Sequence, residues 1–139
     1  DYIVPLGVAD IKRRGRDLTL VGISGGVRVA LEAAEDLAAE GIEAEVVDPR
    51  TLVPLDIDTI VRSVARTRYL VVVDPAHQTC GASAEICTRV VELAFDSLRA
   101  APVRVNTPDI QIPFAPEMEV PLYPNRARVA ETVRKLLGA

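Results

Sequence analysis

Four short runs rich in β-branched and apolar residues alternate along the chain with segments whose apolar residues recur at helical spacing. The runs cover residues 18–23, 43–48, 69–73 and 103–105. Strict alternation of strands and helices is typical of α/β proteins, in which right-handed crossovers keep neighbouring strands parallel. We therefore expect a three-layer α/β/α sandwich around a mainly parallel sheet.

The segments between the runs are predicted to form amphipathic helices, because their apolar residues recur at helical spacing. Gly41 stands where a helix would end, while Asp56 and Asn125 stand where N-caps are expected. Asp74-Pro75 is expected to end the third run, because proline lacks the N–H that a strand donates. Residues 106–124 contain five prolines and are expected to form an extended loop. The first of these helices has its apolar residues at positions 27, 30, 31, 34, 37 and 38.

Composition further limits the class of protein and the kinds of partner that the chain can have. The chain has 139 residues, 49% of them hydrophobic and 26% charged, which suits one folded domain rather than a disordered segment. A net charge of −4 and an aromatic content of 4% argue against a nucleic-acid partner. No apolar run approaches the roughly 20 residues that span a bilayer, so we expect no membrane partner. The first fifteen residues include five charged residues and no continuous apolar stretch, so we expect no signal peptide.

The two cysteines, Cys80 and Cys87, indicate a reducing compartment. On one helix they would lie about 10 Å apart along the axis, which is too far for a disulfide. We therefore expect both thiols to be free and the protein to be cytoplasmic.

One motif suggests catalysis. Gly22-Ile23-Ser24-Gly25-Gly26 fits the G-x-S-x-G nucleophile elbow, and Asp48 or Asp74 followed by His77 would complete a serine, acid, histidine order. The competing interpretation is a turn of small residues that lets a helix pack closely on the sheet. An α/β-hydrolase needs strands before its elbow, whereas this motif follows the first apolar run. The packing turn is therefore favoured over a small serine hydrolase.

The remaining candidates are weaker. The same glycines do not fit the G-x-G-x-x-G or Walker patterns, so a phosphate cradle is disfavoured. His77 and Cys80 could form a nucleophilic pair or bind zinc, but a structural zinc site needs four ligands. An exposed loop histidine is the simpler interpretation. Residue chemistry alone thus assigns no catalytic, cofactor-binding or metal-binding residue.

Five segments together resemble one known family. Residues 47–56 (Val-Asp-Pro-Arg-Thr-Leu-Val-Pro-Leu-Asp) are similar to its V-D-L-R-T-L-x-P-L-D segment, and residues 81–86 to its G-x-G-A-E-I helix start. Residues 106–114 resemble its T-G-P-D-x-x-x-P-F loop, residues 1–9 its incoming linker, and residues 123–125 the start of its closing helix. The family is the transketolase C-terminal-like domain in beta subunits of 2-oxo acid dehydrogenases of the pyruvate, branched-chain or acetoin type.

The resemblance implies a division of labour within a larger enzyme. Residues 1–17 would be the incoming linker and residues 18–139 the transketolase C-terminal-like domain, whose mainly parallel sheet would have five strands. Thiamine diphosphate and magnesium would be bound by the alpha subunit and the N-terminal half of the beta subunit. No G-D-G motif with a downstream Asn-Asn occurs here. This chain alone is therefore expected to bind no cofactor and to be inactive.

The resemblance also implies partners. The domain would contact the alpha subunit and a second beta subunit, form part of the substrate channel, and dock onto the lipoyl acyltransferase core. Arg50 and His77 lie on loops expected at the carboxyl ends of the strands and are predicted to belong to the channel rim. Pro49 replaces the family's usual leucine and weakens any choice among substrates. A free-standing binding or assembly module of the same fold is the alternative.

Overall fold

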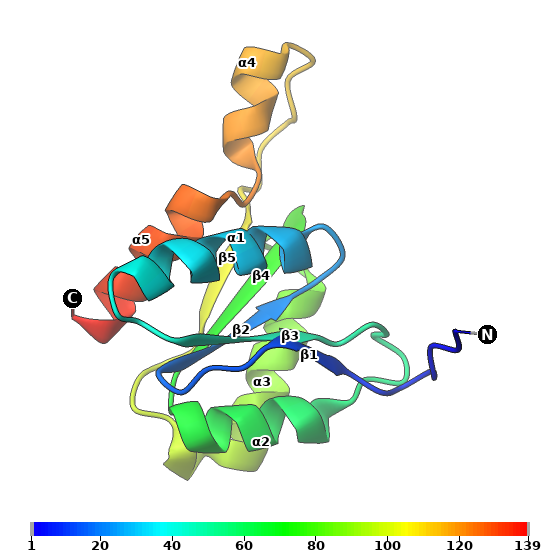
Figure 1. Ribbon diagram of the computed structural model, residues 1–139. Helices are drawn as coiled ribbons and strands as arrows, with labels where there is room; N and C mark the ends of the chain where they lie inside the picture. Colours follow the sequence, from blue (N-terminus) through cyan, green and yellow to red (C-terminus); the bar gives the residue numbers. More distant parts are fainter. Residues whose placement is uncertain (1, 139) are drawn as a thin grey trace.

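A single five-stranded sheet organises residues 2–138, which the computed structural model describes (Figure 1). Its strands lie in the order β1-β3-β2-β4-β5. The four strands β2 to β5 run parallel, and only β1 is antiparallel, against β3. This confirms the mainly parallel, five-stranded α/β sheet. The strands are β1 (Asp10–Arg13), β2 (Leu18–Gly22), β3 (Ala44–Asp48), β4 (Leu70–His77) and β5 (Val103–Thr107).

Two pairs of helices cover the two faces of the sheet. Helices α1 (Gly26–Ala39) and α5 (Arg126–Leu137) cover one face, and α2 (Ile57–Thr67) and α3 (Ala82–Ala94) cover the other (Figure 1). Because successive strand residues point to opposite faces, Leu20 packs under α1 while Val21 packs under α2. Strand β4 accordingly begins with an uninterrupted apolar run, Leu70–Val73, as expected for a strand buried on both sides.

The first strand lies inside the segment expected to be a linker. Residues Asp10–Arg13 pair with β3, with Asp10 opposite Asp48 and Ile11 opposite Val47. Their sequence, Asp-Ile-Lys-Arg, has no apolar run because an edge strand of this kind is only half buried. The expected linker of residues 1–17 thus supplies the fifth strand of the sheet.

Two further expectations need correction. Strand β4 does not end at Asp74-Pro75 but continues to His77, because a bulge removes Pro75 from the ladder between the pairs Asp74–Asn106 and His77–Thr107. Residues 106–124 are also not wholly extended. They contain α4 (Pro116–Glu119) and a 3₁₀ turn, η2 (Val120–Leu122), since proline is well tolerated in the first turn of a helix. A second 3₁₀ turn, η1 (Phe95–Ser97), follows α3.

Helix α2 is anchored at its N-terminus by the predicted cap. The carboxylate of Asp56 accepts hydrogen bonds from the Thr59 N–H (3.1 Å), the Thr59 hydroxyl (2.8 Å) and the Ala9 N–H (2.9 Å). Burial raises the pKa of Asp56, but these donors outweigh that effect and hold the pKa below its usual 3.8. The cap therefore joins α2 to the start of β1.

We expect Asp56→Ala to lower the free energy of unfolding by about 1–2 kcal/mol, because helix donors lose their acceptor. Urea denaturation measures the loss, with Asp58→Ala, which removes an exposed carboxylate from the same turn, as the near-neutral control. Because the pKa of Asp56 is lower in the folded protein, its carboxylate contributes stability that is fully present above pH 3.8. That stability is lost as the pH falls below 3.8 and through the lower pKa of the folded protein. The gap between wild type and Asp56→Ala should therefore close in acid; a gap independent of pH contradicts this account.

Candidate functional site

All sequence-predicted site residues lie at one edge of the sheet, where β2, β3 and β4 end. Ser24 follows β2, Asp48 and Arg50 lie at and after the end of β3, and His77 ends β4. This carboxyl edge is where open α/β sheets bind ligands, usually at the point where the strand order reverses. In this sheet that point lies between β2 and β4.

The reversal point is closed by the backbone of α1. The Ile23 N–H donates to the Val73 carbonyl (2.9 Å), and a Cβ on Gly26 would lie 2.3 Å from the same oxygen. A Cβ on Gly22 would lie 2.5 Å from the Cα of Val27. Both glycines therefore allow the helix to approach the sheet, which supports the packing turn over the phosphate cradle.

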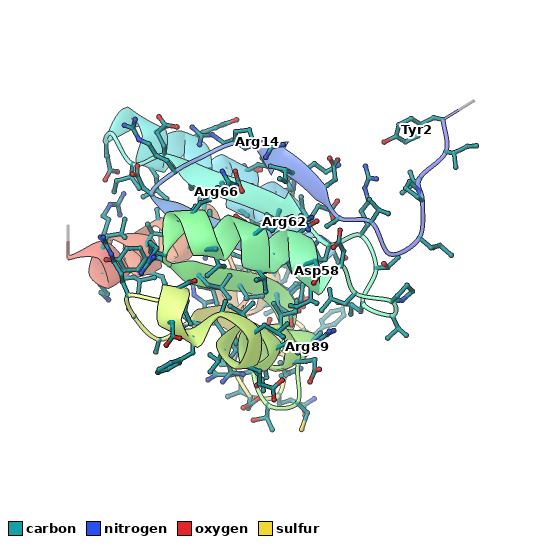
Figure 2. The ribbon with its side chains drawn as sticks, turned by 90° about the horizontal axis from the view of Figure 1, so that it is seen from below. Tyr2, Arg14, Asp58, Arg62, Arg66 and Arg89 are labelled. Carbon is teal, nitrogen blue, oxygen red and sulfur yellow. The ribbon has the colours of Figure 1, made fainter. Side chains whose placement is uncertain are left out.

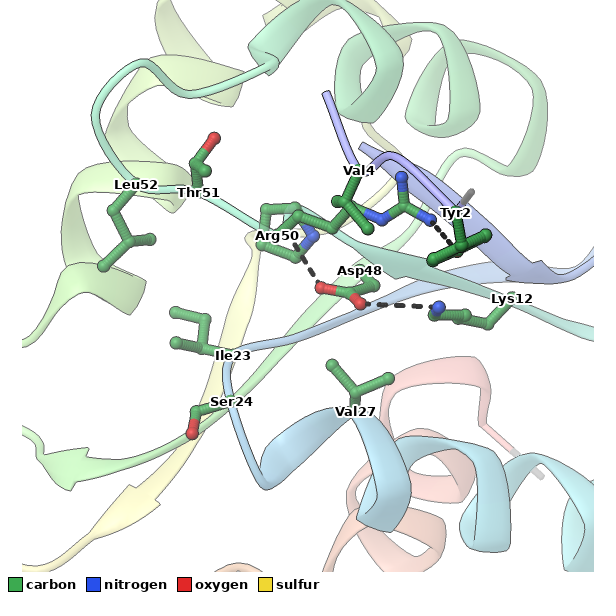
Figure 3. A pocket seen from close by; sticks show the side chains of 11 residues that line it. Tyr2, Val4, Lys12, Ile23, Ser24, Val27, Asp48, Arg50, Thr51 and Leu52 are labelled. Atoms are coloured by element: carbon green, nitrogen blue, oxygen red, sulfur yellow. Dashed lines mark hydrogen bonds and ion pairs between the residues drawn. The ribbon is translucent and has the colours of Figure 1, made fainter. Parts of the chain in front are cut away.

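A pocket of about 470 Å³ opens beside this point, next to the end of β3 (Figure 3). Arg50 lines it with a left-handed backbone (φ +58°), and its N–H donates to the Asp48 carboxylate (2.8 Å). The Arg50 guanidinium pairs with Asp10 (3.0 Å), which also pairs with Lys12 (2.7 Å). The other lining residues include Tyr2, Val4, Ile23, Ser24, Val27 and Leu52.

The charges of this pocket compensate each other. The Lys12 ammonium lies 3.7 Å from the Asp48 carboxylate. Its hydrogen bond to Asp10 lowers the pKa of that carboxyl and in turn raises the pKa of Lys12. The Arg50 side chain is thus half-buried and held by its ion pair with Asp10.

Ser24 has the backbone of an elbow but not the partners. It is exposed and lies at φ +52°, a sharp turn of the kind that nucleophile elbows use. However, Asp74 accepts the N–H groups of Ala76 (2.9 Å) and Ser83 (3.2 Å), and Asp48 accepts the N–H of Arg50. Neither acid orients His77. Among residues 2–138 no serine, histidine, acid chain is formed, so the hydrolase hypothesis has no geometric support.

His77 belongs to a second, separate group at this edge. Its Nε2 lies 3.3 Å from the Ile110 carbonyl, and the nearby Asp109 carboxylate accepts the Thr79 hydroxyl (2.6 Å) and N–H (3.0 Å). The Thr79 hydrogen bonds lower the pKa of Asp109. Since β2 lies between β3 and β4, the strands that lead to Arg50 and to His77 are about 10 Å apart within the sheet. The two predicted rim residues do not line a common pocket.

Sequence reasoning missed a buried polar network between the ends of β4 and β5. Ser83 donates its hydroxyl to the Asn106 side-chain oxygen (3.1 Å), and Arg128 donates from α5 to the Asn106 carbonyl (2.9 Å). The Thr107 hydroxyl donates to the Pro75 carbonyl (2.6 Å). Polar residues at the ends of two neighbouring strands were the available signal. Their bonds fix the loops after β4 and β5 relative to each other.

The nucleophilic pair considered for His77 and Cys80 is not formed in the described residues, because the His77 ring contacts the Ile110 carbonyl and makes no hydrogen bond to Cys80. Burial raises the pKa of the Cys87 thiol to about 11, so it stays protonated at neutral pH. Cys80 is exposed on the loop before α3, and both are free thiols.

In the described part of the chain no group of three His, Cys, Asp or Glu residues could hold a metal ion. No helix in that part is long and apolar enough to cross a bilayer.

Comparison with known families agrees with the fold. The family described as the C-terminal domain of transketolase matches residues 7–129. The chain belongs to this family. Its five-stranded sheet is accordingly the transketolase C-terminal-like sheet that the sequence motifs predicted.

Individual relatives of this transketolase C-terminal domain are subunits of oxidoreductases. The chain is 42% identical over 99% of its length to the acetoin:2,6-dichlorophenolindophenol oxidoreductase subunit beta of Bacillus subtilis, of which it covers 40%. It is 43% identical, again over 99% of its length, to the pyruvate dehydrogenase E1 component subunit beta of the same organism, of which it covers 42%. The chain thus spans about two-fifths of these relatives.

A solved structure shows the same arrangement. A split-gene transketolase, described as an inactive beta4 tetramer, superimposes with a TM-score of 0.84 at 28% identity. The match covers 97% of this chain and 44% of that one. The domain therefore has its counterpart inside a longer polypeptide.

Proposed function

We propose that this chain is the C-terminal assembly and channel-forming domain of a thiamine-diphosphate-dependent 2-oxo acid dehydrogenase beta subunit. The parent enzyme would release CO₂ from a 2-oxo acid and pass the acyl group to lipoyl-lysine, whose disulfide takes up the two electrons. The observation that carries the proposal is 42–43% identity over 99% of this chain to two oxidoreductase beta subunits.

The cofactor would be held elsewhere in the parent. Thiamine diphosphate needs a divalent metal and a cleft for its diphosphate, and the residues of this chain do not fit either requirement. The reversal point of the sheet is filled by α1, and the pocket beside it has its acids engaged by Lys12 and Arg50. The domain would supply a wall and contacts, and its proposed partners are the alpha subunit, a second beta subunit and the lipoyl acyltransferase core.

An arm that projects from the sandwich supports a role in assembly. Residues 108–122, which include α4 and η2, stand away from the body of the domain (Figure 1). Phe114 is 100% exposed, and Ile110, Met118 and Val120 are at least half exposed. A cluster of exposed apolar side chains on a projecting segment is typical of a protein contact surface. We assign this arm to contact with the other subunits.

Phe114→Ala should leave the fold intact and weaken assembly. A fully exposed ring adds little to the stability of the free domain, whereas a buried aromatic anchor often contributes about 2 kcal/mol or more to an interface. In the parent enzyme, size-exclusion chromatography with light scattering would then show dissociated subunits at concentrations where wild type stays assembled. Glu117→Gln, on the same arm, is the matched control. Unchanged assembly in Phe114→Ala would exclude the arm as an anchor.

Arg50 and His77 are proposed to lie on the channel rim. Substitution of a rim residue should raise KM for the lipoyl domain and leave the release of CO₂ from the 2-oxo acid unchanged, since neither side chain would touch the reacting carbon. Because Arg50 also holds Asp10, His77→Gln is the cleaner variant.

The preferred substrate, whether pyruvate, a branched-chain 2-oxo acid or acetoin, is decided by comparing these substrates on the purified parent enzyme.

The proposal is tested first by the intact mass of the native protein. Since 137 aligned residues make up 40% of the relative, a species of about 340 residues is expected after pull-down and mass spectrometry. Such a species, with decarboxylation of a 2-oxo acid when the alpha subunit is present, supports the dehydrogenase assignment. A species of 139 residues would instead indicate a free-standing assembly module.

The two free thiols agree with the cytoplasmic location we propose.

A further inference from the structure

A groove of about 470 Å³ lies on the opposite side of β1 from the Arg50 pocket, between that strand and α2. Three arginines line it: Arg14 from the turn after β1, and Arg62 and Arg66 from α2. Figure 2 looks onto this face and shows the three side chains near one another over β1 and α2. Their convergence contrasts with the net charge of −4 of the whole chain.

The three arginine side chains place like charges close together, and only one of them has an ion-pair partner among the described residues. Arg62 and Arg66 stand four residues apart, which places two positive charges on the same face of the helix at a cost to its stability. Arg66 is paired with the buried carboxylate of Glu45 (2.5 Å). Within residues 2–138, neither Arg14 nor Arg62 makes an ion pair with a carboxylate.

The carboxylates nearest the groove are engaged by other donors. Asp10, at one end, is held by Lys12 (2.7 Å) and Arg50 (3.0 Å). Asp56 accepts the N–H groups of Ala9 and Thr59, and the charge of Arg62 also contributes to its lowered pKa, although the two form no ion pair in the described residues. Asp58, one turn before Arg62, forms no ion pair with it in the described residues. The groove therefore presents two arginines, Arg14 and Arg62, that have no ion-pair partner among the described residues.

The Arg62 guanidinium is also held in place. Its Nη2 donates to the Thr59 hydroxyl (2.8 Å), which in turn donates to Asp56 (2.8 Å). This bond uses one of the five N–H donors of the guanidinium. The others are available at the groove, where the paired arrangement of arginine donors matches the oxygens of phosphate or carboxylate.

We propose that this three-arginine groove binds a small oxyanion that carries at least two negative charges, of the phosphate or polycarboxylate class. The volume suits a small molecule. The adjacent edge of β1 does not favour an added peptide strand, because β1 is four residues long and interrupted by a register shift. The site is independent of the dehydrogenase assignment and of the channel edge.

The test is titration of the chain with inorganic phosphate, pyrophosphate and citrate, each at ionic strength matched with NaCl to remove screening effects. Amide NMR signals of Arg14, Thr59, Arg62 and Ser63 should shift and saturate at or below about 10 mM ligand. Arg62→Gln and Arg14→Gln should each weaken binding by about tenfold, since each removes a charge-assisted donor. Both side chains are exposed, so the variants should fold.

Arg28→Gln is the matched control, because Arg28 is an exposed arginine on α1, on the other face of the sheet. Saturable shifts with any of the three anions, weakened in Arg62→Gln and kept in Arg28→Gln, support the site and reveal which anion class it prefers. Absence of saturation with all three anions overturns the proposal. Equal weakening by Arg28→Gln and Arg62→Gln overturns it too, since binding would then follow overall charge.

Discussion

Gly26→Ala should destabilise the domain by about 3 kcal/mol or prevent its folding, because the new Cβ would lie 2.3 Å from the Val73 carbonyl oxygen. The clash is with backbone, so no side-chain rotation relieves it. Either α1 must move away from β4 or the sheet must distort, and both would separate the packed core of this face. Urea denaturation followed by circular dichroism measures the loss.

Gly25→Ala is the matched control one residue earlier. A Cβ on Gly25 would meet no atom within 4 Å, and its φ of −57° suits any residue. Its stability should be unchanged or raised by up to about 1 kcal/mol, because alanine restricts the unfolded chain. Equal destabilisation by the two substitutions would show that helix capping, and not the approach of α1 to β4, governs this turn.

Arg66→Met should cost about 3 kcal/mol, because it leaves the Glu45 carboxylate buried without its cation. Glu45 is 0% exposed within β3, whereas the Arg66 side chain is 54% exposed and reaches it from α2. This value is the lower end of the range of about 3–5 kcal/mol expected when a buried ion pair loses one partner, because water can partly replace an arginine at the surface. The loss would be measured as the free energy of unfolding in urea at neutral pH.

The double variant Glu45→Gln with Arg66→Met separates a buried charge from lost packing. A neutral amide avoids most of the cost of an unpaired carboxylate, so the double variant should be clearly more stable than Arg66→Met alone. Arg134→Met, which breaks the exposed pair with Glu40, should have a far smaller effect. If Arg66→Met and the double variant were equally stable, the pair would carry no special electrostatic role.

The local sequence pattern was sufficient to predict an element wherever a strand is buried on both faces or a helix is capped by the residue just before it. The run Leu70–Val73 is apolar because both faces of β4 are buried, and Asp56 and Asn125 cap helices from positions that the sequence identifies. Pattern failed at β1, whose edge position demands no apolar run, and at Pro75, which a bulge accommodates. It also failed at Pro116, which begins a helix instead of preventing one.

The sequence by itself determined the fold class and the family, because strand and helix periodicities and five spaced motifs depend on short stretches of chain. Tertiary structure alone decided which candidates share a site. It closed the reversal point with Gly26, separated Arg50 from His77 by a strand, and brought Arg14 beside Arg62 across 48 positions of sequence. Such meetings depend on strand order and helix packing, which no local spacing encodes.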